Sequence, residues 1–144
     1  SGKTTTITGT DVFGDTLTET ITSTGSAEAV AGAKLFLTVS AVECSAKYAA
    51  NIKVGSGTLC AEAVRGSMRL RLKGLSVVSG GSVGNVDYFN GTPETGSSLF
   101  QSRTIGTDNT TVDRTIPADG VLFKSGMSVK YTVGTIDKVT VFFT

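Results

Sequence analysis

The amino-acid sequence predicts an all-β protein built as an antiparallel β-sandwich or barrel. Short segments that alternate apolar with polar residues follow one another along nearly the whole chain, as half-buried strands do. Turns that contain glycine separate these segments, and one strand plus its turn takes roughly 8–12 residues. The chain is also rich in threonine, whose branched Cβ suits a pleated strand better than a helix.

The alternating segments predict individual strands. Thr16–Thr22 is the clearest, because apolar residues alternate with polar ones as in an antiparallel strand with one face in water. Leu35–Val42 is the most apolar run, and we expect it to be a central strand. Ser26–Lys34 has helical residue types, but it is short and contains Gly32, so we expect a loop. The predicted strands are Thr4–Thr8, Thr16–Thr22, Leu35–Val42, Asn51–Val54, Met68–Ser79, Asn85–Phe89, Leu99–Ile105, Thr110–Ile116, Met127–Val133 and Lys138–Thr144.

Two turns have residues with specific turn chemistry. Asp11, Gly14 and Asp15 suit a hairpin loop, because short carboxylates accept local backbone hydrogen bonds and glycine supplies a positive φ. Pro117 sets φ in the turn Ile116–Gly120, which ends on a glycine.

The domain organisation has two readings. A length of 144 residues suits one ordinary domain with a real core. The same strands also fit two small β units, jelly-roll or immunoglobulin-like, that share one core. The predicted boundaries are an N-terminal β unit over 1–57, a connector over 58–66 and a C-terminal β unit over 67–144.

Composition argues against several classes of function. The formal net charge is +1, with 13 basic and 12 acidic residues, so we expect neither a nucleic-acid partner nor a membrane surface as partner. No window approaches the roughly 18–20 apolar residues of a membrane helix. The sequence has no histidine, which excludes the usual hydrolytic triads and makes zinc improbable. We therefore predict no enzyme activity, no cofactor, no metal and no catalytic residue. Cys44 and Cys60 either form a disulfide or remain separate thiols, and the separate thiols are favoured.

Two features suggest contact with other molecules. Tyr88/Phe89 and Phe142/Phe143 are adjacent aromatic pairs, and neighbours in a strand point to opposite faces of the sheet. If one face is core, one member of each pair faces solvent or a partner, unless the sheet is buried on both faces. The only basic cluster places Arg69, Arg71 and Lys73 on one strand face, which is a solvated or interface face rather than a phosphate site. The candidate interface residues are therefore Tyr88, Phe89, Phe142, Phe143, Arg69, Arg71 and Lys73.

Two ordered sets of segments resemble structural proteins of tailed bacteriophages. The first set is Thr8–Asp11, Gly14, Leu17–Ile21, Ala27–Ala33, Leu35–Val42 and Val54–Gly55. The second set is Leu72–Gly80, Ile116–Phe123 and Val139–Phe143. Together the two sets cover most of the chain.

The resemblance implies a virion component, first a decoration or cement protein on the phage head, made in the host cytoplasm. Such proteins are homo-oligomers, often homotrimers, that dock on the major capsid protein, and the family offers no catalytic residues. A neck, tail or fibre-base component is the alternative within the same class. From a different class, a host-receptor or glycan-binding β-sandwich module would use the loops Asn90–Ser98 and Gly106–Asp113 as its recognition surface.

Overall fold

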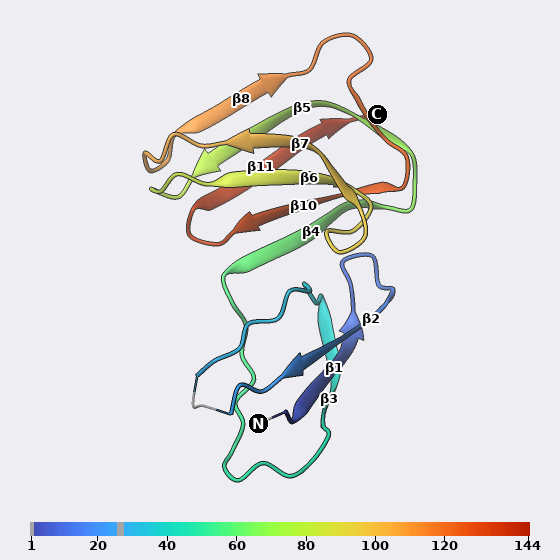
Figure 1. Cartoon of the computed structure of the whole chain (residues 1–144). Coiled ribbons are helices and arrows are strands. Elements are labelled where there is room, and N and C mark those ends of the chain that lie inside the picture. Colours follow the sequence, from blue (N-terminus) through green and yellow to red (C-terminus); the bar gives the residue numbers. More distant parts are fainter. Residues whose placement is uncertain (1, 26–27) are drawn as a thin grey trace. The chain divides into compact units, whose positions relative to one another are not determined.

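The computed structural model describes residues 2–25 and 28–144, and it confirms the all-β prediction. All regular elements in these ranges are strands, and their pairings are antiparallel. The chain divides into two compact units, which we call unit 1 (Ser1–Gly57) and unit 2 (Thr58–Thr144) (Figure 1). The strands are β1 (Thr4–Thr10), β2 (Thr16–Thr22), β3 (Thr38–Cys44), β4 (Leu59–Gly66), β5 (Leu70–Ser79), β6 (Asn85–Asn90), β7 (Ser97–Arg103), β8 (Thr111–Thr115), β9 (Val121–Phe123), β10 (Gly126–Thr132) and β11 (Ile136–Phe143).

Unit 1 is a three-stranded sheet in the order β2-β1-β3, and the register of its strands separates two kinds of face. Four of the five threonines on β1, all except Thr5, pair directly with threonines on β2, so these side chains share one face. Ile7 pairs with Val42 and Gly9 pairs with Leu17, which makes the opposite face largely apolar. The threonine face consists of Thr4, Thr6, Thr8, Thr10, Thr16, Thr18, Thr20, Thr22 and Thr38.

An irregular segment before β3 is tied to the apolar face of unit 1. Glu19 lies on that face, and its carboxylate accepts hydrogen bonds from the backbone N–H groups of Ala33 at 2.6 Å and Lys34 at 3.3 Å. The N–H of Leu37 donates to the carbonyl oxygen of Thr10 at 2.8 Å. The prediction of a loop in this region is confirmed for residues 28–34, and Ser26 and Ala27 lie outside the described residues.

The hairpin turn between β1 and β2 has the predicted chemistry. Asp11 Oδ1 accepts hydrogen bonds from the N–H groups of Phe13 at 2.8 Å and Asp15 at 3.0 Å. Gly14 adopts a φ of 90°, which a residue with a Cβ rarely tolerates. The carboxylate and the glycine together fix the register of the hairpin.

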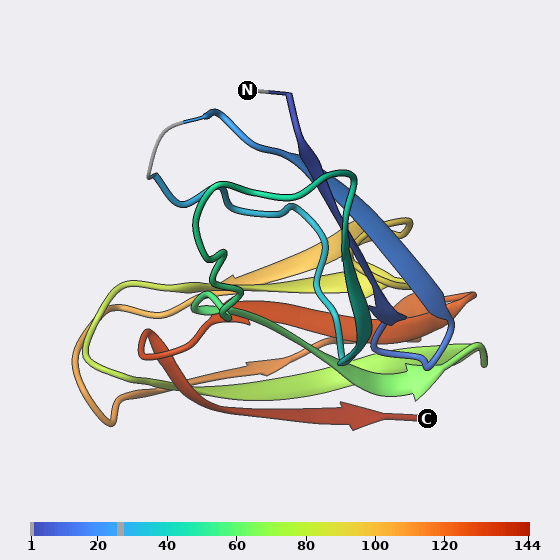
Figure 2. The same ribbon diagram turned by 90° about the horizontal axis from the view of Figure 1, so that it is seen from below.

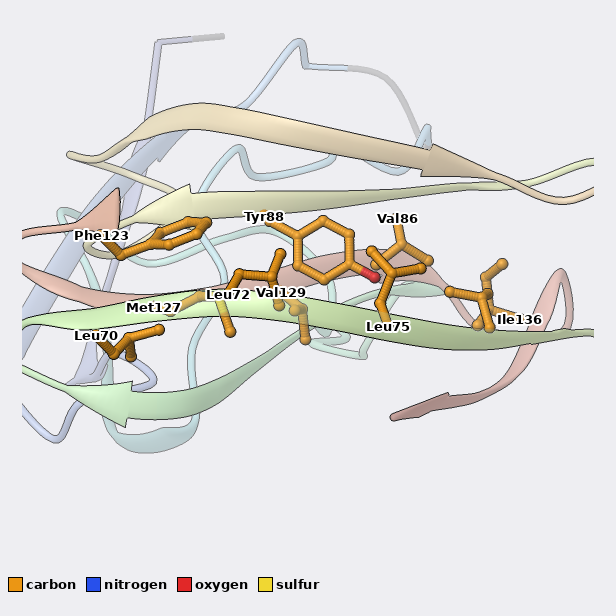
Figure 3. Close-up of a cluster of buried hydrophobic side chains, with 10 residues drawn as sticks. Leu70, Leu72, Leu75, Val86, Tyr88, Phe123, Met127, Val129 and Ile136 are labelled. Atoms are coloured by element: carbon orange, nitrogen blue, oxygen red, sulfur yellow. The ribbon is translucent and has the colours of Figure 1, made fainter. Parts of the chain in front are cut away.

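Unit 2 is a sandwich of two sheets, β4-β10-β6-β7 and β11-β5-β8, and β9 also pairs with β5. Figure 2 shows the two sheets as stacked layers. The hydrophobic core lies between them (Figure 3) and consists of Leu70, Leu72, Leu75, Val77, Val86, Tyr88, Phe123, Met127, Val129 and Ile136. In immunoglobulin domains the first strand pairs with the second strand, and the last strand pairs with the next-to-last. In unit 2 the first strand, β4, pairs instead with the next-to-last strand, β10, and the last strand, β11, pairs with the second strand, β5. The two outer strands have therefore exchanged sheets.

A bulge in β5 allows this strand to serve the core over its whole length. Leu72 pairs with Phe143, but Gly74 pairs with Phe142, so β5 has one extra residue at Lys73. The inward-facing positions therefore change from Leu70 and Leu72 to Leu75, Val77 and Ser79. Without the bulge, strict alternation would turn one half of the strand away from the core.

The structure corrects several boundaries. The predicted connector over 58–66 is wrong, because Leu59–Gly66 is strand β4 and hydrogen-bonds to β10. The strand predicted for Asn51–Val54 is absent from the described residues, since that segment is irregular. The predicted strand Leu35–Val42 is shifted to Thr38–Cys44, and it lies at an edge instead of the centre. The short strand β9 was not predicted.

Within the described ranges, no helix is long and apolar enough to cross a membrane.

Candidate interface surfaces

Tyr88 belongs to the core of unit 2 and not to an interface, so its prediction as an interface residue is wrong. Its side chain is fully buried, its ring lies 5.7 Å from that of Phe100, and its hydroxyl lies 3.4 Å from that of Ser102. Burial raises the pKa of Tyr88 above its usual value of 10, and the hydrogen bond to Ser102 opposes that shift. Tyr88 therefore acts as a packing residue whose polar end is satisfied internally.

Phe89 points to the opposite face of β6, as the adjacency argument requires, but it is only 8% exposed. The ammonium group of Lys130, on the neighbouring strand β10, lies 5.0 Å from the centre of its ring, which is a cation–π distance. The expectation that one member of each aromatic pair is exposed is wrong for this pair. At Tyr88 and Phe89 both faces of β6 are buried, as the alternative predicted.

Phe142 and Phe143 are both exposed, by 57% and 38%. They lie near the end of β11, which is an edge strand of its sheet. Phe142 pairs with Gly74, a residue without a side chain, and Phe143 pairs with Leu72 at the rim of the core. The two rings point to opposite sides of the sheet, so this end of β11 presents apolar surface on both of its faces.

The basic cluster stabilises a turn. Arg71 Nη1 donates a hydrogen bond to the carbonyl oxygen of Asp119 at 3.2 Å, and Lys73 Nζ donates to the carbonyl oxygen of Ala118 at 2.9 Å. Ala118 has a φ of 55°, an unfavourable conformation for a residue with a Cβ. Arg69 lies before β5 and is exposed. The predicted face is therefore present for Arg71 and Lys73, but both side chains hold the Ile116–Gly120 turn.

Unit 1 exposes large apolar side chains that were not predicted to be exposed. Leu37 is 62% exposed and Val39 is 54% exposed, although their run was expected to be buried in a central strand. The sequence signal that could have indicated this exposure was the presence of large apolar residues outside regular strands, because irregular segments rarely enclose a core. We use the name unit 1 apolar surface for the exposed area that these side chains contribute from several segments of the unit: Val30, Leu37, Val39, Val42, Ile52 and Val54.

A shallow hollow lies on the outer face of the β11-β5-β8 sheet. Gly74 and Ser76 form its floor, with Phe142 on one side and Asp113 and Thr115 on the other. An exposed ring beside hydroxyl and carboxylate groups can stack on a sugar and accept its hydrogen bonds.

The two loops expected to form one recognition surface are too far apart to do so. Asn90–Ser98 ends in the first residues of β7, and Gly106–Asp113 follows the last residue of that strand, Arg103. A seven-residue strand is about 23 Å long at about 3.3 Å per residue, so the loops lie at opposite ends of the sheet. The two loops can therefore take part only in two separate surfaces.

One further pair of titratable side chains, Tyr131 and Glu62, is in direct contact. Tyr131 Oη donates to Glu62 Oε1 at 2.5 Å, and this hydrogen bond, together with burial, raises the pKa of Tyr131. Cys44 and Cys60 are free thiols, in agreement with the favoured reading. In the described part of the chain, no three histidine, cysteine, aspartate or glutamate side chains come together in a group that could hold a metal ion.

Comparison of the chain with protein-family models, with curated proteins and with solved structures found no match.

Proposed function

We propose that this chain is a virion structural protein, a decoration protein that binds the head of a tailed bacteriophage as a homo-oligomer. The observation that carries the proposal is the unit 1 apolar surface. Among the described residues of unit 1, Val12 is the only large apolar side chain that is buried, whereas Leu37, Val39 and Val54 are more than half exposed. A three-stranded sheet with so little enclosed core gains stability when another surface covers it.

The proposed mechanism is mechanical and involves no catalysis. Unit 2 has its own core and provides a rigid body, and unit 1 provides apolar area that is buried against neighbouring copies and the major capsid protein. A protein that binds only the assembled shell stabilises that shell by mass action. The resemblance to phage structural proteins suggests a homotrimer on the outer surface of the head, after synthesis in the host cytoplasm.

The test combines the mass of the protein in solution with binding to capsids. By light scattering we expect a mass that is a multiple of three chains, and we expect the oligomer to co-sediment with capsids that lack it. Val39→Asp places a charge in the unit 1 apolar surface and should abolish co-sedimentation. Val83→Asp is the matched control, because Val83 is similarly exposed, at 52%, in a turn of unit 2.

The outcomes separate the proposal from its alternatives. Co-sedimentation that Val39→Asp and Val83→Asp affect equally would overturn the assignment of the contact to unit 1. A monomer that does not bind capsids would overturn the decoration function. Binding to isolated necks, tails or fibre bases instead of heads would assign the chain to those structures.

A glycan-binding module is a second candidate, favoured by the hollow beside Phe142. Its ring, the hydroxyl of Ser76 and the carboxylate of Asp113 line one shallow site. A glycan array supports this function only if Phe142→Ala abolishes a signal that Phe143→Ala retains, because Phe143 points to the other side of the sheet.

A further inference from the structure

We propose that two copies of this chain pair through the free edges of their β11 strands, antiparallel and centred on Thr140. This contact is independent of the proposed function, because it uses the edge of unit 2 and not the unit 1 apolar surface. It would form a continuous sheet across two molecules, related by a twofold axis.

The first argument is the character of the strand. One edge of β11 pairs with β5, and the sheet order leaves the other edge without a strand partner among the described residues. The free edge of a strand exposes N–H and C=O groups that can pair with a further strand. From Val139 to Phe143, four of the five side chains are large and apolar, and none is charged, proline or glycine. Such a segment at an edge favours pairing with another strand.

The second argument comes from three of the other edge strands, β2, β4 and β8, which have features that discourage pairing. β2 has Glu19 at its centre, and β4 carries Glu62 and Arg65. β8 is five residues long and contains Asp113 and Arg114. Charges and short length are the usual protection of sheet edges in proteins. The end of β11 has neither charges nor a short length, so its free edge remains open to pairing with another strand.

The third argument concerns charge, which favours a register centred on Thr140 over one centred on Lys138. In an antiparallel pair centred on Thr140, Lys138 of one copy lies opposite Phe142 of the other, and Val139 lies opposite Val141. Unit 2 already combines a lysine with a phenylalanine on neighbouring strands, since the Lys130 ammonium lies 5.0 Å from the centre of the Phe89 ring. A register centred on Lys138 would place two ammonium groups opposite each other, which is unfavourable. The complementary partner of β11 is therefore a second β11.

The local geometry of β11 is suited to this pairing. The irregularity near its start places the extra residue at Asp137, and the one near its end places the extra residue on β5, at Lys73. Lys138–Phe143 is thus a regular strand, with Lys138, Thr140 and Phe142 on one face. Direct pairing brings opposed Cβ atoms to about 4.5–5.5 Å, close to the spacing that a disulfide can span.

Disulfide formation between introduced cysteines tests both the contact and its register. The background carries Cys44→Ser and Cys60→Ser, which removes both native thiols. In this background we expect Thr140→Cys to form a covalent dimer on mild oxidation. A mixture of Lys138→Cys chains and Phe142→Cys chains should cross-link between the two kinds of chain, whereas neither variant should cross-link to itself. Thr111→Cys, exposed on β8 of the same sheet, is the control that should remain monomeric under denaturing electrophoresis.

A charge at the twofold axis provides an independent readout. Two homotrimers joined through their β11 edges have twice the mass of one homotrimer. Thr140→Lys places two ammonium groups opposite each other and should therefore halve the mass measured by light scattering, whereas Thr111→Lys should leave the mass unchanged. Circular dichroism establishes that both variants are folded.

Several results would overturn the pairing. These are equal cross-linking of the Thr140→Cys and Thr111→Cys chains, self-cross-linking of Lys138→Cys alone, and a mass that Thr140→Lys does not change. If β11 amides gain protection from hydrogen exchange only when capsids are added, the edge binds a capsid subunit and not a second copy. An oligomer without the Thr140 cross-link would overturn this contact and leave the proposed oligomeric decoration function intact.

Discussion

The two units of this chain use apolar residues in different ways. Unit 2 places its large aliphatic and aromatic side chains between two sheets, where Leu72, Tyr88, Phe123 and Met127 are fully buried. Unit 1 has a single sheet, whose threonine face needs no cover and whose apolar side is tied to an irregular segment through Glu19. Strand content alone therefore does not make a unit self-sufficient, because a second layer is required to enclose a core.

The largest expected difference is the effect of removing one apolar side chain from each unit. Phe123→Ala removes a fully buried ring and should lower the free energy of unfolding by about 3–5 kcal/mol. Leu37→Ala shortens a side chain that is 62% exposed and should change the free energy of unfolding by less than about 0.5 kcal/mol. The measurement is urea unfolding followed by tyrosine fluorescence, in which Tyr48 reports on unit 1 and Tyr88 and Tyr131 report on unit 2. Equal losses would remove the distinction between the units.

Hydrogen exchange in the intact chain measures the same difference locally. β1 and β5 are both central strands with partners on each side, so their amides are a matched comparison. We expect the slowest amides of β1 to exchange about a hundredfold faster than those of β5, which corresponds to about 2.7 kcal/mol. Similar protection in both strands would mean that unit 1 is stable without cover. Protection of β1 that rises on capsid binding would support the proposed docking role.

Alkaline pH should weaken unit 2. The pKa values of Tyr88 and Tyr131 are raised above their usual value of 10, so above that pH the folded state holds protons that the unfolded state has lost. These tyrosines therefore contribute stability that is fully present below about pH 10 and is lost as the pH rises further. Urea midpoints measured across this range should fall, and Tyr131→Phe should reduce the fall. An unchanged slope in that variant would contradict the role of the Glu62 hydrogen bond.

The smallest expected effect concerns the turn held by the basic cluster. Lys73→Met removes the hydrogen bond to the Ala118 carbonyl oxygen and should cost about 1 kcal/mol. Arg69→Met is the matched control at an exposed position outside the strand and should cost less than about 0.5 kcal/mol. Thermal unfolding of the two variants gives the comparison, and equal shifts in Tm would mean that the lysine does not hold the turn.

Strands with clear alternation were predictable from the sequence alone. The bounds of β2 agree with the prediction, because threonine occupies every second position along its whole length and Leu17 and Ile21 lie between the threonines. β4 was missed since its Cys-Ala-Glu-Ala core has weak strand preference, and its state is decided by pairing with β10. The apolar run at Leu35 was placed in a central strand because hydrophobicity does not distinguish a buried strand from an irregular segment.

The candidate interface was predictable only in part. Adjacency in a strand correctly places Phe142 and Phe143 on opposite faces, but it does not say which faces are covered. Tyr88 and Phe89 obey the same rule and are both buried, because each has packing partners from other strands. Likewise, the carbonyl groups that bind Arg71 and Lys73 come from a turn more than forty positions later in the sequence. Contacts at such separations depend on the tertiary fold and leave no local pattern.

The bulge at Lys73 makes β5 more sensitive to its length than to its composition. Substitution of the lysine should cost little, as predicted above. Deletion of one residue at this point would rotate Leu70 and Leu72 from the core to the water-facing side, while the half of the strand that pairs with β8 kept its orientation. Among descendants of this sequence, we therefore expect many amino acids at this position but a constant number of residues between Leu72 and Leu75.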